Sequence, residues 1–225
     1  MTRGAVLFDL DGTLLDSLAG IHAALLNTAE ELQLAPPAEA RTRASIGDGV
    51  ENLLLRAFDA PADLPRLHAV YDRHYSSTSI AAARAFTGIE PLLRALDPAR
   101  TAVLSNKPER HCRRLLRALD LEQCFAHIAG GDTFPEKKPS ALPVLRLLAQ
   151  LGADAADAVL VGDGPQDIRA ARNAGVKSIA VLWGFSERSK LAGLGPDLVV
   201  EDVAALMHAL ATHARRHSPD GLSSR

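Results

Sequence analysis

Residues 5–14 place two acidic side chains directly after a short apolar run, and this stretch constrains the fold strongly. The run Ala-Val-Leu-Phe has no polar position, which is typical of a strand buried on both faces of a parallel sheet. Residues two apart in an extended backbone point the same way, so Asp9 and Asp11 should face one crevice beyond that strand. Two carboxylates held this close repel each other unless a divalent cation lies between them or one carries a proton. Gly12 then permits a tight turn, and Thr13 adds a hydroxyl beside the acids.

The rest of the chain alternates short apolar runs with segments of helical periodicity. Such alternation predicts a parallel sheet with helices on both faces, a Rossmann-like doubly wound α/β fold. In sheets of this kind ligands bind at the carboxyl ends of the strands. We expect further strands over residues 101–104, 126–129, 158–161, 176–182 and 198–200. We expect the covering helices over residues 89–96, 109–119, 141–151, 168–174 and 203–213.

An insertion separates the first strand from the rest of the predicted sheet. It contains three stretches with apolar residues at helical spacing, over residues 15–34, 50–58 and 62–75. Such a block can form a lid over the strand ends. The expected organisation is a Rossmann-like core of residues 1–14 and 86–213, a helical cap of residues 15–85 and a flexible tail of residues 214–225.

The composition argues against several classes of partner. The chain has 225 residues, and 25 Lys and Arg against 27 Asp and Glu leave a formal net charge of -2. This balance provides no electrostatic footprint for nucleic acid or for an anionic membrane. Cys112 and Cys124 are the only cysteines, and they lack a metal-ligand or redox spacing. No apolar stretch is long enough to span a bilayer, so we predict a cytoplasmic protein, monomeric or homodimeric, with neither nucleic-acid nor membrane partners.

Ser105 and Asn106 directly follow the predicted strand over residues 101–104. The serine hydroxyl and the next backbone N–H could hold a phosphoryl oxygen. On the residues alone, an ordinary turn between a strand and a helix is the better explanation of this serine.

The tripeptide Gly-Asp-Gly occurs twice, which makes it a weak signal by itself. Around Asp48 it precedes a helix of the insertion and is typical of a helix cap. Around Asp163 it ends a predicted buried strand, and Asp167 follows four residues later. Asp167 also suits the N-cap of the helix predicted over residues 168–174.

The segment Phe-Asp-Leu-Asp-Gly-Thr-Leu, residues 8–14, resembles the first motif of the haloacid dehalogenase superfamily of phosphotransferases. The segments at residues 105–108, 138–139 and 162–167 are similar to its later motifs and follow in the expected order. The resemblance implies that Asp9 is a nucleophile that forms an aspartyl-phosphate. It also implies that Asp11 is the general acid and base.

The same resemblance implies which residues bind the phosphoryl group. Thr13, Ser105 and Asn106 would contact it. Lys138 would neutralise its charge and steady the nucleophile, since the lysine of the family directly precedes proline. The adjacent Lys137 is then interpreted as a solvated surface residue.

The implied cofactor is Mg²⁺, which prefers carboxylate and carbonyl oxygens. Asp9, Asp163 and the backbone carbonyl of Asp11 are the implied metal ligands. Asp167 would act from outside the ligand shell.

Within the superfamily, the insertion and the segment Trp-Gly-Phe at residues 183–185 resemble the phosphoglycolate phosphatase group. The resemblance implies a Mg²⁺-dependent phosphatase for a small phosphate monoester, with 2-phosphoglycolate as the expected substrate. Another sugar-phosphate phosphatase and a β-phosphoglucomutase-like phosphotransferase stay open as alternatives. The mutase is disfavoured, because Ile21 stands where mutases usually place a cap histidine and His22 is one step off. A phosphoacceptor signalling domain is the alternative of another class, but such a module needs no cap.

Substrate choice should depend on the insertion, because the core residues named above recognise only the phosphoryl group. Arg41, Arg43 and the backbone amides of residues 47–50 are donors that suit a small anion. They favour a compact phosphorylated acid over a bulky neutral sugar phosphate. Plain surface positions would explain the two arginines as well.

Overall fold

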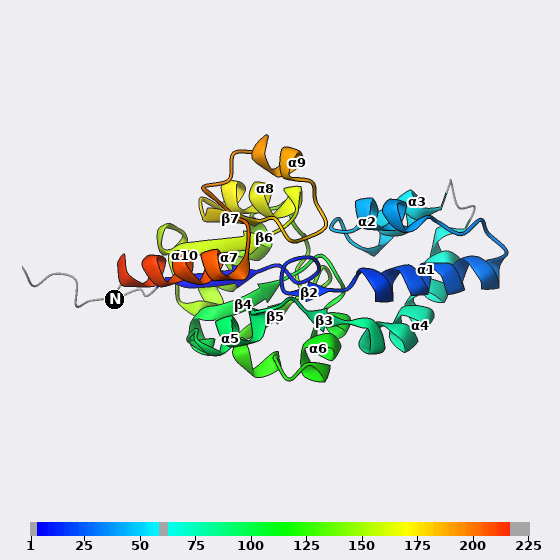
Figure 1. The fold of residues 1–225 in the computed structure, drawn as a ribbon, viewed down its shortest axis with the longest axis horizontal. Helices are drawn as coiled ribbons and strands as arrows, with labels where there is room; N and C mark the ends of the chain where they lie inside the picture. The colour runs from blue at the N-terminus through cyan, green and yellow to red at the C-terminus, as the bar shows by residue number, and fades with distance from the viewer. Residues whose placement is uncertain (1–3, 59–62, 217–225) are drawn as a thin grey trace, which may run out of the picture.

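A computed structural model describes residues 4–58 and 63–216. In this part of the chain six parallel strands form one sheet, in the order β5-β4-β1-β6-β7-β8 (Figure 1). Their bounds are Ala5–Phe8 for β1, Thr101–Leu104 for β4, His127–Ala129 for β5, Ala158–Gly162 for β6, Lys177–Val181 for β7 and Leu198–Val200 for β8. β1 lies between β4 and β6, so the carboxyl end of β1 is flanked by two other strand ends. This order places Asp9 inside the edge where such sheets bind ligands.

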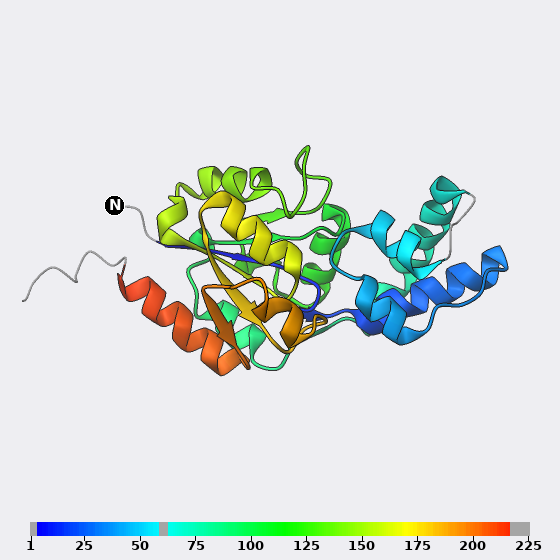
Figure 2. The same cartoon turned by 90° about the horizontal axis from the view of Figure 1, so that it is seen from above.

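Helices cover both faces of the sheet, as Figure 2 shows. One face carries α5 (Ile89–Arg94), α6 (Glu109–Ala118) and α10 (Val203–Arg216), and the other carries α7 (Leu142–Leu151) and α8 (Pro165–Ala174). Val6 and Phe8 belong to the hydrophobic core on the first face, and Ala5 and Leu7 belong to the core on the second. The alternation of side chains along a strand therefore buries all of β1. The predicted doubly wound α/β fold is confirmed.

The insertion folds beside the carboxyl edge of the sheet (Figure 1). Its helices are α1 (Leu18–Leu32), α2 (Glu39–Ser45), α3 (Val50–Ala57) and α4 (Leu64–Ala82). Of these, α1, α3 and α4 share a hydrophobic core of their own, which includes Leu25, Leu54 and Tyr71. We call residues 15–85 the cap, following the division that the sequence predicts.

The cap joins the sheet through a two-stranded antiparallel ribbon of β2 (Leu15–Asp16) and β3 (Arg84–Ala85). Residues 15 and 16 were expected to begin a helix. Their backbone instead pairs with a segment far along the chain, which local periodicity does not reveal. The helix accordingly starts at Leu18.

Other helix bounds also differ from expectation. α2 and α9 (Arg188–Ala192) lie in stretches where no helix was expected. α4 continues to Ala82, although its serine-rich segment over residues 76–79 has modest helix propensity. Packing explains the extension, because a Cβ on Gly20 of α1 would lie only 3.2 Å from Cα of Ser79. The missing side chain lets the two helices approach closely along this segment.

The C-terminal helix α10 continues to Arg216, beyond the expected start of the tail at residue 214. Residues 217–225 of the predicted tail lie outside the described residues. Across residues 4–58 and 63–216, none of the helices has the length and apolar character needed to cross a membrane.

Candidate active site

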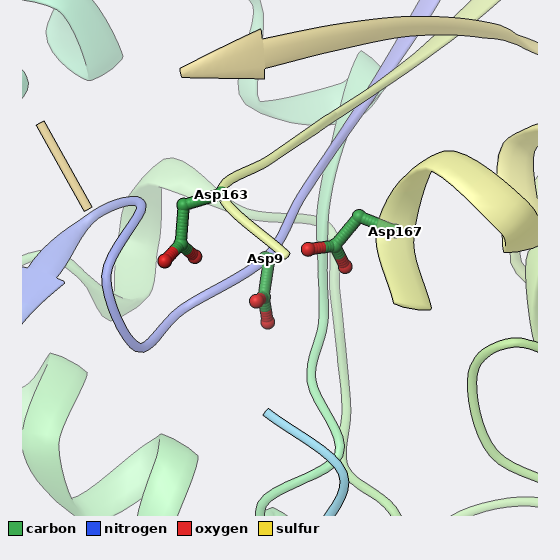
Figure 3. A group of neighbouring side chains, drawn as sticks. All are labelled: Asp9, Asp163 and Asp167. Atoms are coloured by element: carbon green, nitrogen blue, oxygen red, sulfur yellow. The ribbon is translucent and has the colours of Figure 1, made fainter. Parts of the chain in front are cut away.

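Three buried aspartates meet at the carboxyl edge of the sheet. Asp9 follows β1, Asp163 follows β6, and Asp167 lies in the first turn of α8. One carboxylate oxygen from each lies within 4.8 Å of the others. Figure 3 shows the carboxyl groups gathered together, with Asp9 between the other two. Because all three side chains are buried, water screens their mutual repulsion poorly.

Lys138 supplies the ion pairs that this cluster makes within the described part of the chain. Its Nζ lies 2.8 Å from Oδ1 of Asp9 and 2.6 Å from Oδ1 of Asp167, and its side chain is fully buried. Burial and the Asp167 carboxylate raise the pKa of Asp9 well above its usual value. The same two causes raise the pKa of Asp163 to about 7. Three carboxylates with one ammonium leave excess negative charge, and such an oxygen-rich group suits a hard divalent cation.

Asp163 is oriented by two donors from different segments. Oγ1 of Thr13 donates to its Oδ1 at 3.1 Å, and the backbone N–H of Phe185 donates to its Oδ2 at 2.7 Å. The indole Nε1 of Trp183 donates to the carbonyl of Thr13 at 3.0 Å. The Trp-Gly-Phe segment after β7 therefore helps to hold the carboxylate. Thr13, predicted to contact the phosphoryl group, uses its hydroxyl on Asp163 in this structure.

Asp167 connects the cluster to its lysine. Its Oδ1 accepts from Lys138, and its Oδ2 accepts from the backbone N–H of Gly164 at 2.9 Å. Both carboxylate oxygens thus have partners within the protein. The Asp167 carboxylate nevertheless belongs to the cluster.

The Asp11 side chain lies in different surroundings from that of Asp9. Its Oδ1 accepts from Oγ of Ser17 at 2.5 Å, and its Oδ2 lies 2.6 Å from Nζ of Lys107. Burial lowers the pKa of Lys107, but the Asp11 carboxylate together with Tyr75 and Tyr71 outweighs burial and holds that pKa well above its usual value. Sequence reasoning did not assign a role to Lys107. The only available signal was its position directly after Ser105 and Asn106 at a strand end.

Ser105 and Asn106 follow β4, as predicted, and Asn106 connects the core to the cap. Its Nδ2 donates to the carbonyl of Gly47 in the cap and to the carbonyl of Lys138, both at 2.9 Å. Oγ of Ser105 accepts from the backbone N–H of Lys107 at 3.3 Å. These contacts place both residues at the rim of the carboxylate cluster.

A cavity lies between this rim and the cap. Its core side includes Asp9, Asp11, Ser105 and Lys107, so the predicted nucleophile and general acid face one space. Its cap side includes mostly apolar and aromatic side chains, among them Ile21, Val50, Leu53, Tyr71 and Tyr75. A ligand in this cavity would contact the sheet edge and the cap together.

The two cap arginines do not line this cavity. Nε of Arg41 donates to the carbonyl of Arg56. Arg43 lies over the ring of Phe185, 5.3 Å from its centre, and donates to the carbonyl of Gly184 at 3.2 Å. Arg43 thus connects the cap to the segment that orients Asp163. Of the donors expected to select the substrate, those at residues 47–50 remain, because Gly47, Gly49 and Val50 do line the cavity.

The comparison with protein families agrees with this geometry. The model of the haloacid dehalogenase-like hydrolases matches residues 6–181. The chain therefore belongs to the haloacid dehalogenase-like hydrolases. It is a phosphatase, a phosphoric monoester hydrolase that acts on small phosphate esters.

Several proteins are similar to this chain over most of their length. A phosphoglycolate phosphatase from Rhodospirillum rubrum is 39% identical over 215 residues, which cover 90% of this chain and 88% of the relative. One from Chromobacterium violaceum is 38% identical over 212 residues, covering 90% and 94%. A crystal structure from Haemophilus somnus, described as a predicted phosphoglycolate phosphatase, is 26% identical with a TM-score of 0.85 and covers 92% of this chain and 97% of that one.

At Gly12 the backbone closely approaches the carboxylate cluster, and this position provides a test of the site. Its φ is +84°, and a Cβ there would lie 2.3 Å from Oδ2 of Asp163. We expect Gly12→Ala to displace Asp163 and to lower kcat/KM for a phosphate ester by at least ~10²-fold, because small displacements of reacting groups are costly. Steady-state kinetics on the purified variant would measure this loss.

Gly175→Ala is the matched control, because Gly175 also has a positive φ, +67°, but a Cβ there meets nothing within 4 Å. It should cost about 1 kcal/mol of stability from backbone strain and leave kcat/KM near the wild-type value. Equal losses of activity in the two variants would show that general strain, not the position of Asp163, causes the effect.

Proposed function

We propose that this phosphatase depends on Mg²⁺ and hydrolyses 2-phosphoglycolate through an aspartyl-phosphate at Asp9. The observation that carries the proposal is the different surroundings of the two acids of the first motif. Asp9 lies in the carboxylate cluster beside Lys138, whereas Asp11 faces Lys107 and Ser17. Two carboxylates in different surroundings can take different roles in one reaction.

In the proposed first step, a carboxylate oxygen of Asp9 attacks phosphorus while the ester P–O bond breaks. The Leu10 N–H and Lys138 both engage Oδ1 of Asp9, which fixes the orientation of the carboxylate. The departing ester oxygen takes a proton from the carboxyl group of Asp11. Asp9 then carries the phosphoryl group.

In the second step, water attacks the phosphorus and returns Asp9 as a free carboxylate. Asp11 accepts the proton of that water and is ready to act as an acid again. Inorganic phosphate is the second product. Lys138 neutralises charge on the phosphoryl group, and Ser105 and Asn106 lie where they can hold its oxygens.

Asp9, Asp163 and the backbone carbonyl of Asp11 would hold Mg²⁺. The residues fit such an ion, because three buried carboxylates face one ammonium group and the pKa of Asp163 is raised to about 7 by burial and by Asp167. When bound, Mg²⁺ supplies positive charge that neutralises the phosphoryl oxygens.

The proposed substrate rests on the cavity and on the relatives. The similar proteins from Rhodospirillum rubrum and Chromobacterium violaceum are named phosphoglycolate phosphatase. In this chain bulky side chains of the cap line the cavity, which favours a compact leaving group. The mutase alternative stays disfavoured, since Ile21 faces the cavity and the Nδ1 of His22 contacts Oγ1 of Thr42 at 2.9 Å.

Kinetics with two substrates and two metal ions would test this function. We expect kcat/KM with Mg²⁺ to be at least ~10-fold higher for 2-phosphoglycolate than for glucose 6-phosphate, because the bulky cap side chains around the cavity suit the smaller leaving group. Replacing Mg²⁺ by Ca²⁺ should inhibit turnover. The larger ion accepts six to eight oxygens and can engage both oxygens of Asp9, which prevents an in-line attack.

Each part of the proposal can fail separately. A wide preference for hexose phosphates would contradict 2-phosphoglycolate as the substrate. The assignment of the chain as a phosphatase would still hold. Equal rates with Mg²⁺ and Ca²⁺ would contradict the metal ligands named here.

A further inference from the structure

The hydroxyl group of Tyr75 has no hydrogen-bond partner among the described residues, although the side chain is buried. Tyr75 belongs to α4 of the cap and lines the cavity opposite the sheet edge. Leaving a buried hydroxyl without a partner is costly, so such a group in a ligand cavity points to a missing acceptor or donor. Burial raises the pKa of Tyr75 to about 12, which keeps the hydroxyl protonated and able to donate.

Lys107 brings positive charge to the same place. Its Nζ lies 4.7 Å from the centre of the Tyr75 ring and 2.6 Å from Oδ2 of Asp11. A lysine ammonium has three N–H donors, and Asp11 occupies one direction around it. Asp11, the proposed general acid, therefore lies directly beside the Lys107 ammonium. That ammonium can also reach the leaving group.

The other charged groups of this region are already paired. Asp72 of α4 contacts Arg110 and lies 2.7 Å from Nε2 of His111, both on α6. His111 in turn packs its ring edge against Tyr75, with ring centres 4.9 Å apart. These contacts fix the tyrosine ring and neutralise Asp72. Beside the backbone of Gly47, Gly49 and Val50, which also lines the cavity, an anionic leaving group would meet two side-chain donors here, Lys107 and the Tyr75 hydroxyl.

We propose that Lys107 and the Tyr75 hydroxyl form a subsite that binds a carboxylate on the leaving group. The proposal rests on the proposed function, in which Asp11 protonates the ester oxygen. In 2-phosphoglycolate a single carbon separates that oxygen from the carboxylate, so a substrate oxygen beside Asp11 places the carboxylate near Lys107. The apolar side chains of Ile21, Val50 and Leu53 offer no donor to such a group. The cap therefore selects its substrate through Tyr75 rather than through Arg41 or Arg43.

A matched pair of substrates tests this subsite. 2-Phosphoglycolate and its amide, phosphorylated glycolamide, differ in charge but hardly in size. We expect the wild-type enzyme to prefer the carboxylate by at least ~10-fold in kcat/KM, because a hydrogen bond to a charged group contributes strongly. Tyr75→Phe keeps the ring beside Lys107 and removes only the hydroxyl. It should reduce that preference several-fold, mainly by raising KM for 2-phosphoglycolate.

Product inhibition gives a second readout on the same variant. Glycolate probes the proposed subsite, whereas inorganic phosphate probes the phosphoryl site. With p-nitrophenyl phosphate as the reporter, Tyr75→Phe should raise the inhibition constant of glycolate and leave that of phosphate within about twofold. An unchanged phosphate constant also shows that the variant folds. Lys107→Met should abolish the carboxylate preference and lower kcat as well, because Asp11 loses its ion pair.

Two results would contradict the proposal that Lys107 and Tyr75 form a carboxylate subsite. One is a wild-type enzyme that hydrolyses the acid and the amide equally well. The other is a Tyr75→Phe enzyme with an unchanged ratio of the two rates and an unchanged glycolate constant. A preference for hexose phosphates would instead contradict the proposed substrate, and the ratio of acid to amide would still decide whether the subsite exists.

Discussion

Asp9→Asn is expected to lower turnover of phosphate esters by ~10⁴-fold or more while the protein stays folded, because an amide cannot replace the attacking carboxylate. The substitution is nearly isosteric. The amide oxygen can still accept from the Leu10 N–H, which lies 2.7 Å from Oδ1 of Asp9. Steady-state kinetics and circular dichroism on the same preparation would measure activity and fold together.

Asp9→Asn should also change the Tm of the protein, and the direction of this change reports on the repulsion within the carboxylate cluster. Asp9 is one of three buried carboxylates, and burial together with Asp167 raises its pKa. Asparagine removes one repelling charge, so we expect a higher Tm than wild type without metal. Mg²⁺ should raise the Tm of the wild-type protein and raise that of the variant less, because the variant offers a weaker ligand.

Asp48→Asn is the matched control, since Asp48 is an aspartate of the cap with an exposed ion pair to Arg56. It should retain activity and change stability by less than about 1 kcal/mol. Asp11→Asn separates the two proposed roles, because a substrate with a good leaving group should still phosphorylate Asp9 and leave a phosphoprotein detectable by mass spectrometry. Substantial steady-state activity in Asp9→Asn would exclude the covalent mechanism.

The sequence predicted the sheet well because its strands are short, fully apolar and separated by helical segments. β4 has the bounds that were expected, residues 101–104, and β1 is buried along its whole length. Periodicity is a local signal, and the short apolar runs that form these strands are local features of the sequence. The β2–β3 ribbon and the end of α4 depend on partners elsewhere in the chain, so the same signal missed them.

The sequence predicted those site residues that belong to a recognisable motif and lie at the carboxyl edge of the sheet. Asp9, Asp163 and Lys138 gather as the motifs indicated, because parallel strands end at one edge. Lys107 was missed, since its role depends on Asp11 and on a cap tyrosine that no spacing rule connects to it. Arg43, for which a substrate contact and a plain surface position were both open, lies over the ring of Phe185, because charge alone does not fix the direction of a long side chain.

Lys138→Met is expected to have the largest combined effect on stability and activity. The ammonium of Lys138 is fully buried between Asp9 and Asp167. Methionine has a similar length but no charge, so the substitution leaves the buried carboxylates without their counter-ion. Breaking a buried ion pair in this way costs about 3–5 kcal/mol. Turnover should fall by ~10²–10³-fold, as for the loss of a group that stabilises transition-state charge.

The adjacent Lys137 provides a control that also tests the choice between the two lysines. Its Nζ lies near Gly49 of the cap, and its side chain is only partly buried. Lys137→Met should therefore change the free energy of unfolding by less than about 1 kcal/mol and leave kcat near the wild-type value. Urea unfolding would measure the change in the free energy of unfolding for both variants. An inactive Lys137→Met beside an active Lys138→Met would contradict the assignment of Lys138 as the lysine that neutralises the phosphoryl charge, and its ion pairs with Asp9 and Asp167 would then be structural alone.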